Sequence, residues 1–126
     1  MGWRDKRVDF STLVGKTLTS VGISTDEIVF STSGGEQYKM YHSQDYCESV
    51  IVEDICGDIE DLLGSPVLVA EEATSIENPE GVTMDYQYSF TWTFYKIDTA
   101  KGGVTIRWYG ESNGYYSERV DFCLMT

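Results

Sequence analysis

A short segment at positions 42–48 gathers side chains that could bind a metal ion or attack a substrate. It contains His42, Asp45, Cys47 and Glu48. These ligand types suit zinc, but a structural zinc site usually has four ligands with paired spacing, and only one imidazole and one thiol are present here. The alternatives are a redox or nucleophilic cysteine, or a chain turn in which Cys47 packs as a small hydrophobe. We expect the turn, with these residues as a structural core motif and no bound metal.

A second group, nearer the C-terminal end, has the side chains of a nucleotide site. It comprises Arg107, Tyr109, Asn113, Tyr115 and Arg119. Guanidinium groups match phosphate oxygens, and tyrosine rings stack on bases. The group could therefore bind a small nucleotide. It would equally suit an exposed sheet face on which arginine stacks on tyrosine and pairs with Asp121 or Glu111.

Charge is concentrated in the middle of the chain. No lysine or arginine lies between Met40 and Tyr95, and the twelve carboxylates of that stretch account for the whole net charge of −12, since 21 acidic and 9 basic residues become nine of each without them. Such a field repels nucleic acid and anionic membranes. It could mimic a phosphate track and occupy a basic cleft on another protein, or it could be solvated surface.

Motifs of catalysis are scarce in this sequence. We find no Ser-His-Asp set, phosphate loop or dinucleotide fingerprint, and the single histidine leaves little acid–base chemistry. Spacing alone does not exclude a paired-carboxylate hydrolase. We expect a protein that is not an enzyme and has no cofactor.

The elements that would position these residues are mostly strands. Alternation and turn signals predict a meander over 17–23, 27–31 and 37–42, a strand over 49–52, extended structure over 67–70 and a long strand over 84–94 with its aromatic residues on one core face. Asp58 as N-cap and Gly64 as stop predict a short helix over 58–63.

The last two strands are expected to form a hairpin, 103–109 with 115–124. A five-residue loop would pair Trp108 with Tyr116 and Tyr109 with Tyr115, which places Arg107 and Arg119 on one face. The fold expected is α+β and mostly antiparallel β-sheet, with a meander, long hairpins and one short helix. It would be a single domain over 1–126, with 1–12 as an N-terminal lead-in.

Cysteine content and hydropathy suggest a cellular compartment. The three cysteines are an odd number in no metal-binding pattern, which suits free thiols in a reducing environment. No apolar run is long enough to cross a bilayer. We expect a soluble, cytoplasmic protein that does not bind membranes or nucleic acid.

Three segments resemble a family of small phage and prophage proteins of unassigned function: 41–50, 53–66, and 91–96 together with 106–118. The resemblance covers nearly everything from Leu13 onward. That family has Asp-Cys-Cys-Glu where this chain has Tyr46 between Asp45 and Cys47. The core motif followed by a short helix is also similar, more distantly, to the Thoeris anti-defence family of phage sponge proteins. Members of that family bind cyclic ADP-ribose isomers or cyclic oligonucleotides without cleaving them, and form homo-oligomers.

The resemblance implies a phage anti-defence protein in the infected bacterial cell. It would sequester a cyclic nucleotide immune signal as a homo-oligomer, and the Arg and Tyr face would be its ligand surface. The alternative, from the charge, is an acidic nucleic-acid mimic that inhibits a basic host protein such as a defence nuclease. An enzyme acting on nucleotides is a third possibility.

Overall fold

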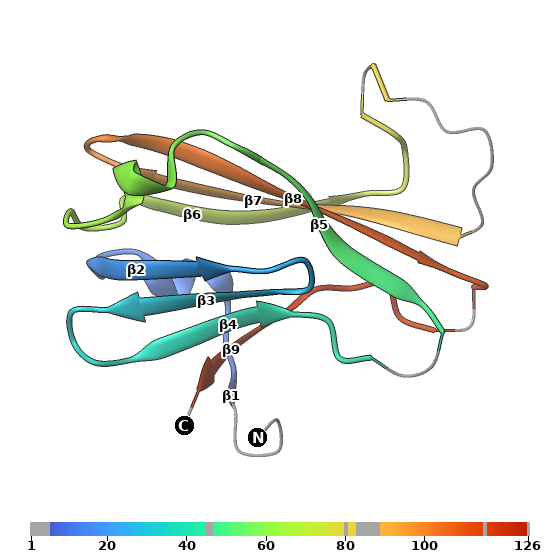
Figure 1. The fold of residues 1–126 in the computed structure, drawn as a ribbon, viewed down its shortest axis with the longest axis horizontal. Coiled ribbons are helices and arrows are strands. Elements are labelled where there is room, and N and C mark those ends of the chain that lie inside the picture. Colours follow the sequence, from blue (N-terminus) through green and yellow to red (C-terminus); the bar gives the residue numbers. More distant parts are fainter. Residues whose placement is uncertain (1–5, 45–46, 80, 83–88, 115, 126) are drawn as a thin grey trace.

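Two antiparallel β-sheets pack face to face in this computed structural model, which describes residues 6–44, 47–79, 81–82, 89–114 and 116–125 (Figure 1). The first sheet has the order β1-β9-β4-β3-β2, and the second has the order β5-β8-β7-β6. The first comprises β1 (Lys6–Arg7), β2 (Leu18–Ile23), β3 (Glu27–Thr32), β4 (Gln37–Tyr41) and β9 (Asp121–Met125). The second comprises β5 (Ser49–Cys56), β6 (Val69–Ser75), β7 (Ser89–Thr99) and β8 (Gly102–Ser112).

The predicted meander is confirmed as β2, β3 and β4, which pair in sequence order. Each connection is a short turn, and Gly35 takes a positive φ of 91° between β3 and β4. The expected mostly antiparallel β fold is therefore correct. It follows from local signals, because alternation and turn residues specify neighbouring strands directly.

The predicted helix over 58–63 is a single 3-10 turn, η3 (Ile59–Leu62), and the described residues contain no α-helix. Asp58 does act as the N-cap, since its side chain accepts a hydrogen bond from the backbone N–H of Glu60. Gly64 ends the turn with a positive φ. A segment this short gains too few hydrogen bonds to offset the cost of nucleating an α-helix.

The prediction for the long strand gave it the wrong inward face. Tyr95 and Ile97 belong to the core cluster, so by alternation Trp92 and Phe94 lie on the outer face of the second sheet. Trp92 is nevertheless fully buried, because its indole N–H donates to Asn78 and its ring packs 4.6 Å from that of Tyr109. Positions 84–88 of the predicted strand lie outside the described residues.

The predicted C-terminal hairpin is wrong. β8 pairs with β5 and β7, whereas β9 pairs with β4 and β1 in the opposite sheet. Trp108 lies opposite Thr93 and Val52 rather than Tyr116. Because both edges of β8 are already paired, the chain must cross from one sheet to the other between Ser112 and Asp121.

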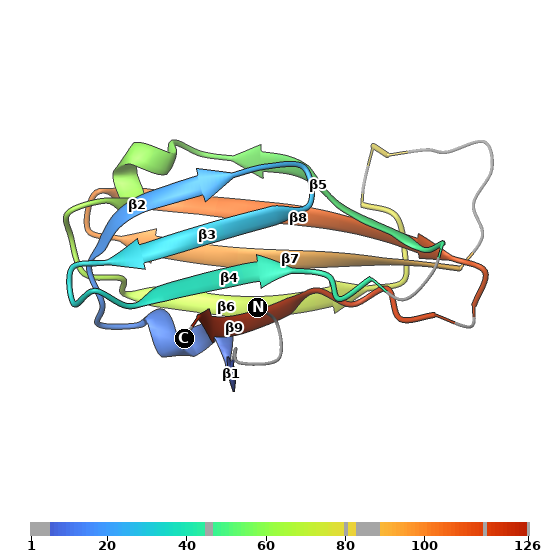
Figure 2. The same ribbon diagram turned by 60° about the horizontal axis from the view of Figure 1, so that its bottom comes forward.

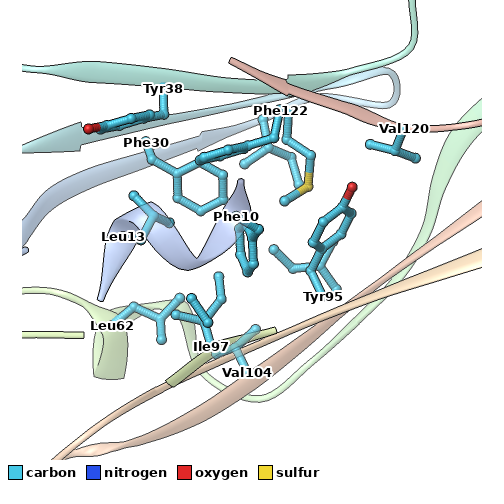
Figure 3. Packing of buried hydrophobic residues seen from close by; sticks show 14 of the residues in the cluster. Phe10, Leu13, Phe30, Tyr38, Leu62, Tyr95, Ile97, Val104, Val120 and Phe122 are labelled. Carbon is cyan, nitrogen blue, oxygen red and sulfur yellow. The ribbon is translucent and has the colours of Figure 1, made fainter. Parts of the chain in front are cut away.

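The core between the sheets is built around aromatic rings (Figure 3). Phe10, from the 3-10 turn η2 (Phe10–Leu13), meets Tyr95 and Phe122 edge to face, with ring centroids 4.7 and 5.1 Å apart. The segment expected as a lead-in thus contributes a central core residue. Among the described residues, no helix is long and apolar enough to cross a membrane.

Candidate functional site

A cleft of about 690 Å³ is lined by residues of β6 and β7 from the second sheet, and by residues of β1, β9 and the segments next to them from the first. Figure 2 shows β6 and β9 along the same edge of the sandwich. Val8, Phe10, Val120 and Phe122 give it an apolar floor. Apart from Ala73, the remaining lining is polar and falls into two walls, one on the side of each sheet. Eight of the thirteen lining residues are polar or charged, so the cleft suits a small polar ligand that carries an apolar part.

The wall from the first sheet carries two guanidinium groups on one carboxylate. Asp121 is buried, with 6% of its side chain exposed, and it contacts Arg7 at 3.3 Å and Arg119 at 3.2 Å. The arginine side chains are themselves 64% and 59% exposed. Since each guanidinium has five N–H donors, most of these donors remain available to an anion entering the cleft.

The wall from the second sheet carries hydroxyl and carboxylate groups. Thr91 and Thr93 come from β7, and Glu72 and Thr74 come from β6. The Tyr95 hydroxyl donates to Glu72 at 2.7 Å. Burial, and next the hydrogen bond to Glu72, raise the pKa of Tyr95 well above its ordinary value. Tyr95 therefore stays protonated and keeps the Glu72 carboxylate at the cleft.

Thr93 lacks a hydrogen-bond partner within the described part of the chain. The residue is 1% exposed, and its buried hydroxyl oxygen makes no hydrogen bond to any other described residue. Native proteins pair nearly all such groups, because an unsatisfied buried hydroxyl is costly. Thr93 is one of the residues that line the cleft, so a molecule bound there lies next to this residue.

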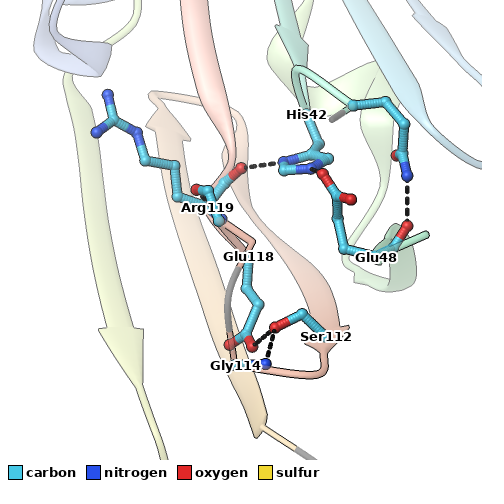
Figure 4. A network of polar contacts seen from close by, with 8 residues as sticks. His42, Glu48, Ser112, Gly114, Glu118 and Arg119 are labelled. Atoms are coloured by element: carbon cyan, nitrogen blue, oxygen red, sulfur yellow. Dashed lines mark hydrogen bonds and ion pairs between the residues drawn. The ribbon is translucent and has the colours of Figure 1, made fainter. Parts of the chain in front are cut away.

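The crossover segment before β9 holds Arg119 at the cleft (Figure 4). The imidazole of His42 donates from Nδ1 to the Arg119 carbonyl at 2.7 Å, and its Nε2 lies 2.8 Å from the Glu48 carboxylate. On the other side, the Glu118 carboxylate accepts hydrogen bonds from Thr91 and Ser112. The segment is thus fixed to the loop after β4 through His42, and to β7 and β8 through Glu118.

The predicted core motif is only partly assembled. His42 and Glu48 form a buried pair, with side-chain exposures of 4% and 0%. Cys47 is exposed, so the expectation that it packs as a small hydrophobe is wrong. Asp45 lies outside the described residues. Within those residues no group of three or more histidine, cysteine, aspartate or glutamate side chains is arranged to hold a metal ion.

The predicted ligand face is divided between two surfaces. Arg107 lies on the outer face of the second sheet, where it pairs with Glu53 at 2.6 Å and stacks over Trp92 at 5.1 Å. Tyr109 lies beside it and donates to Glu111. Arg119 is at the inter-sheet cleft instead. Asn113 is exposed in the turn after β8, and Tyr115 lies outside the described residues.

Sequence reasoning missed Arg7, Glu72 and Thr93. The sequence pattern assigns Arg7 to the N-terminal lead-in and Thr93 to the solvent side of the long strand. The usable signal was the polar alternation of Thr91 and Thr93, which reaches the cleft once the strand's inward face is reversed.

No curated protein and no solved structure matches this chain. A family does match, and its range of 11–122 contains both walls of the cleft except Arg7, Val8, Asp9 and Phe10. That family is described as a domain of unknown function, DUF7448, and the chain belongs to it.

Proposed function

We propose that this protein binds a small cyclic nucleotide in the inter-sheet cleft and sequesters it without cleaving it. The observation that carries the proposal is the pair of exposed guanidinium groups, Arg7 and Arg119, held on the buried Asp121 above an apolar floor. Guanidinium groups recognise phosphate oxygens through paired N–H donors. The floor offers an apolar surface to a base.

The surroundings of His42 support binding rather than hydrolysis. It is the only histidine of the chain, and both of its ring nitrogens are engaged, with the Arg119 carbonyl and with Glu48. Its side chain is 4% exposed. A general acid or base must reach the proton that it transfers, so His42 is better suited to holding the chain than to catalysis.

The biological setting comes from the resemblance to phage sponge proteins. We propose on that basis that the ligand is a signal of a bacterial immune system, of the cyclic ADP-ribose type, and that the protein acts in the infected cell as a homo-oligomer. Gel filtration with light scattering tests the assembly. The family to which the chain belongs carries no assigned activity that would support or oppose this role.

Calorimetry with cyclic ADP-ribose isomers and cyclic dinucleotides tests the proposal. Replacing Arg119→Gln removes a charge-assisted contact worth about 1.5–3 kcal/mol, so affinity should fall about ten- to a hundredfold. Arg107→Gln is the matched control, because Arg107 lies on the outer face and is paired with Glu53. The Arg107→Gln variant should bind each ligand with the same affinity as the parent protein. The reverse pattern, or no heat with any of these ligands, would contradict the proposal.

A second measurement separates sequestration from catalysis. Protein loaded with the ligand found by calorimetry is heat-denatured, and the released molecule is weighed by mass spectrometry. We expect the intact cyclic compound in full yield. Recovery of a ring-opened or hydrolysed product would show instead that the protein is an enzyme.

A further inference from the structure

The wall formed by β6 and β7 carries hydroxyl and carboxylate groups, and the proposed binding of phosphate by the guanidinium groups gives these groups no role. Glu72 lies opposite Tyr95 in the ladder, and Thr74 lies opposite Thr93. Glu72, Thr74, Thr91 and Thr93 line the cleft from the second sheet, and Arg7 and Arg119 line the same cleft from the side of the first. These groups accept and donate hydrogen bonds but carry no positive charge, so they suit hydroxyls rather than phosphate.

Two of these residues are incompletely bonded. The hydroxyl of Thr93 is buried and has no partner among the described residues. Glu72 uses one oxygen, Oε2, to accept from Tyr95, and leaves acceptor capacity at the cleft. A carboxylate that accepts from a sugar hydroxyl is a common feature of ribose recognition.

We propose that this wall is a subsite for the hydroxyls of a ribose whose phosphate lies against Arg7 and Arg119. This inference rests on the proposed function in one respect, since both place the ligand in the same cleft. The sugar hydroxyls accept from or donate to Thr93 and donate to Glu72. The cleft therefore favours ribose phosphates over their 2-deoxy counterparts.

Ribose 5-phosphate and 2-deoxyribose 5-phosphate test the subsite as a pair that differs by one hydroxyl. Titrations followed by NMR on the full chain suit their modest affinity. We expect the ribose compound to bind about three- to tenfold more tightly, the range expected for one hydrogen bond. In Thr93→Val this preference should disappear, whereas Arg119→Gln should weaken both compounds alike. AMP, measured beside them, tests whether a base adds affinity.

Thermal melting of the free protein tests whether Thr93 has a structural role, because replacing a structural residue would lower the melting temperature. Thr93→Val replaces an unsatisfied hydroxyl by a methyl group of the same size, so the melting temperature should be unchanged or higher. Thr99→Val is the matched control on the same strand and face, because its hydroxyl donates to the Asp61 carbonyl. That variant should melt lower.

The outcomes separate the two proposals. Equal binding of the two sugar phosphates to the parent, with both weakened by Arg119→Gln, would overturn the subsite and leave the phosphate site standing. A preference for ribose that persists in both Thr93→Val and Glu72→Gln would also overturn it. Binding of neither compound nor of AMP would count against the cleft as a nucleotide site altogether.

Discussion

Arg107 and Arg119 carry the same charge, but they differ in how far nearby carboxylates neutralise it and so in how well each could attract an anionic ligand. Arg107 is 23% exposed, pairs with Glu53, and lies 3.9 Å from Asp54, so two carboxylates face one cation. At Asp121 the ratio is reversed, since Arg7 and Arg119 share this one carboxylate, and Asp9 and Glu72 are the other acidic residues of the cleft lining. Residue type alone does not distinguish these cases, because the distinction lies in which acidic groups the fold brings near.

Cys56 offers a prediction at the same scale. Its thiol donates to the Asp54 carboxylate at 3.4 Å, and this hydrogen bond, with the negative charge behind it, raises the pKa of Cys56 above its ordinary value. Alkylation needs the thiolate, so this exposed cysteine should react slowly with iodoacetamide near pH 8. Asp54→Asn should lower the pKa and speed the reaction several-fold.

Mass spectrometry of the labelled protein measures the rate at each site separately. Cys47 is also exposed and serves as the internal reference within the same molecule. A Cys56 rate that does not change in Asp54→Asn, relative to Cys47, would show that the carboxylate does not control this thiol.

At the level of strands, the sequence predicts local pairing well and long-range pairing poorly. The meander of β2, β3 and β4 follows from alternation and short turns. The strand β7 is joined to β8 by a short turn, but the other partner of β8, which is β5, and both partners of β9 come from distant parts of the chain, and no turn residue specifies them. The cleft forms where the two sheets meet, so the sequence does not predict that its two walls lie together. Of the cleft residues, Arg119 alone is recognised from the sequence as a candidate binding residue.

The crossover segment between β8 and β9 depends on Gly110. A Cβ atom at this position of β8 would come within 2.6 Å of the Glu118 carbonyl oxygen, so Gly110→Ala forces apart β8 and the segment that carries Arg119. We expect a loss of about 1–3 kcal/mol in the free energy of unfolding. Nucleotide affinity should fall as well, because the arginine moves with its backbone.

Urea unfolding and calorimetry measure the two effects. Gly22→Ala is the matched control, since a Cβ atom there meets nothing within 4 Å and the residue also lies in a strand. It should be close to neutral in both measurements. If Gly110→Ala behaves in the same way, the crossover segment is not held against β8 as tightly as the contact implies.

Over the whole molecule, the acidic middle segment is less uniform than its sequence suggests. Several of its carboxylates have partners within the protein: Glu48 with His42, Glu53 and Asp54 with Arg107, and Glu72 with Tyr95. Glu60, Glu71 and Glu77 are exposed and lie away from the cleft lining. An acidic mimic would have to act through exposed groups such as these.

Neutralising those three residues therefore separates the two functional hypotheses. In the variant Glu60→Gln, Glu71→Gln, Glu77→Gln, binding of a cyclic nucleotide should change less than about twofold, since exposed charges outside the cleft are screened within about 8 Å at physiological ionic strength. Docking on a basic protein surface should weaken strongly, and the parent's docking should fall with added salt. The discriminating measurement is the protection of phage from the immune system in a defence assay at constant protein level. Protection retained by the triple variant and lost in Arg119→Gln supports sequestration in the cleft, and the opposite result supports the acidic mimic, because each variant removes only one of the two surfaces.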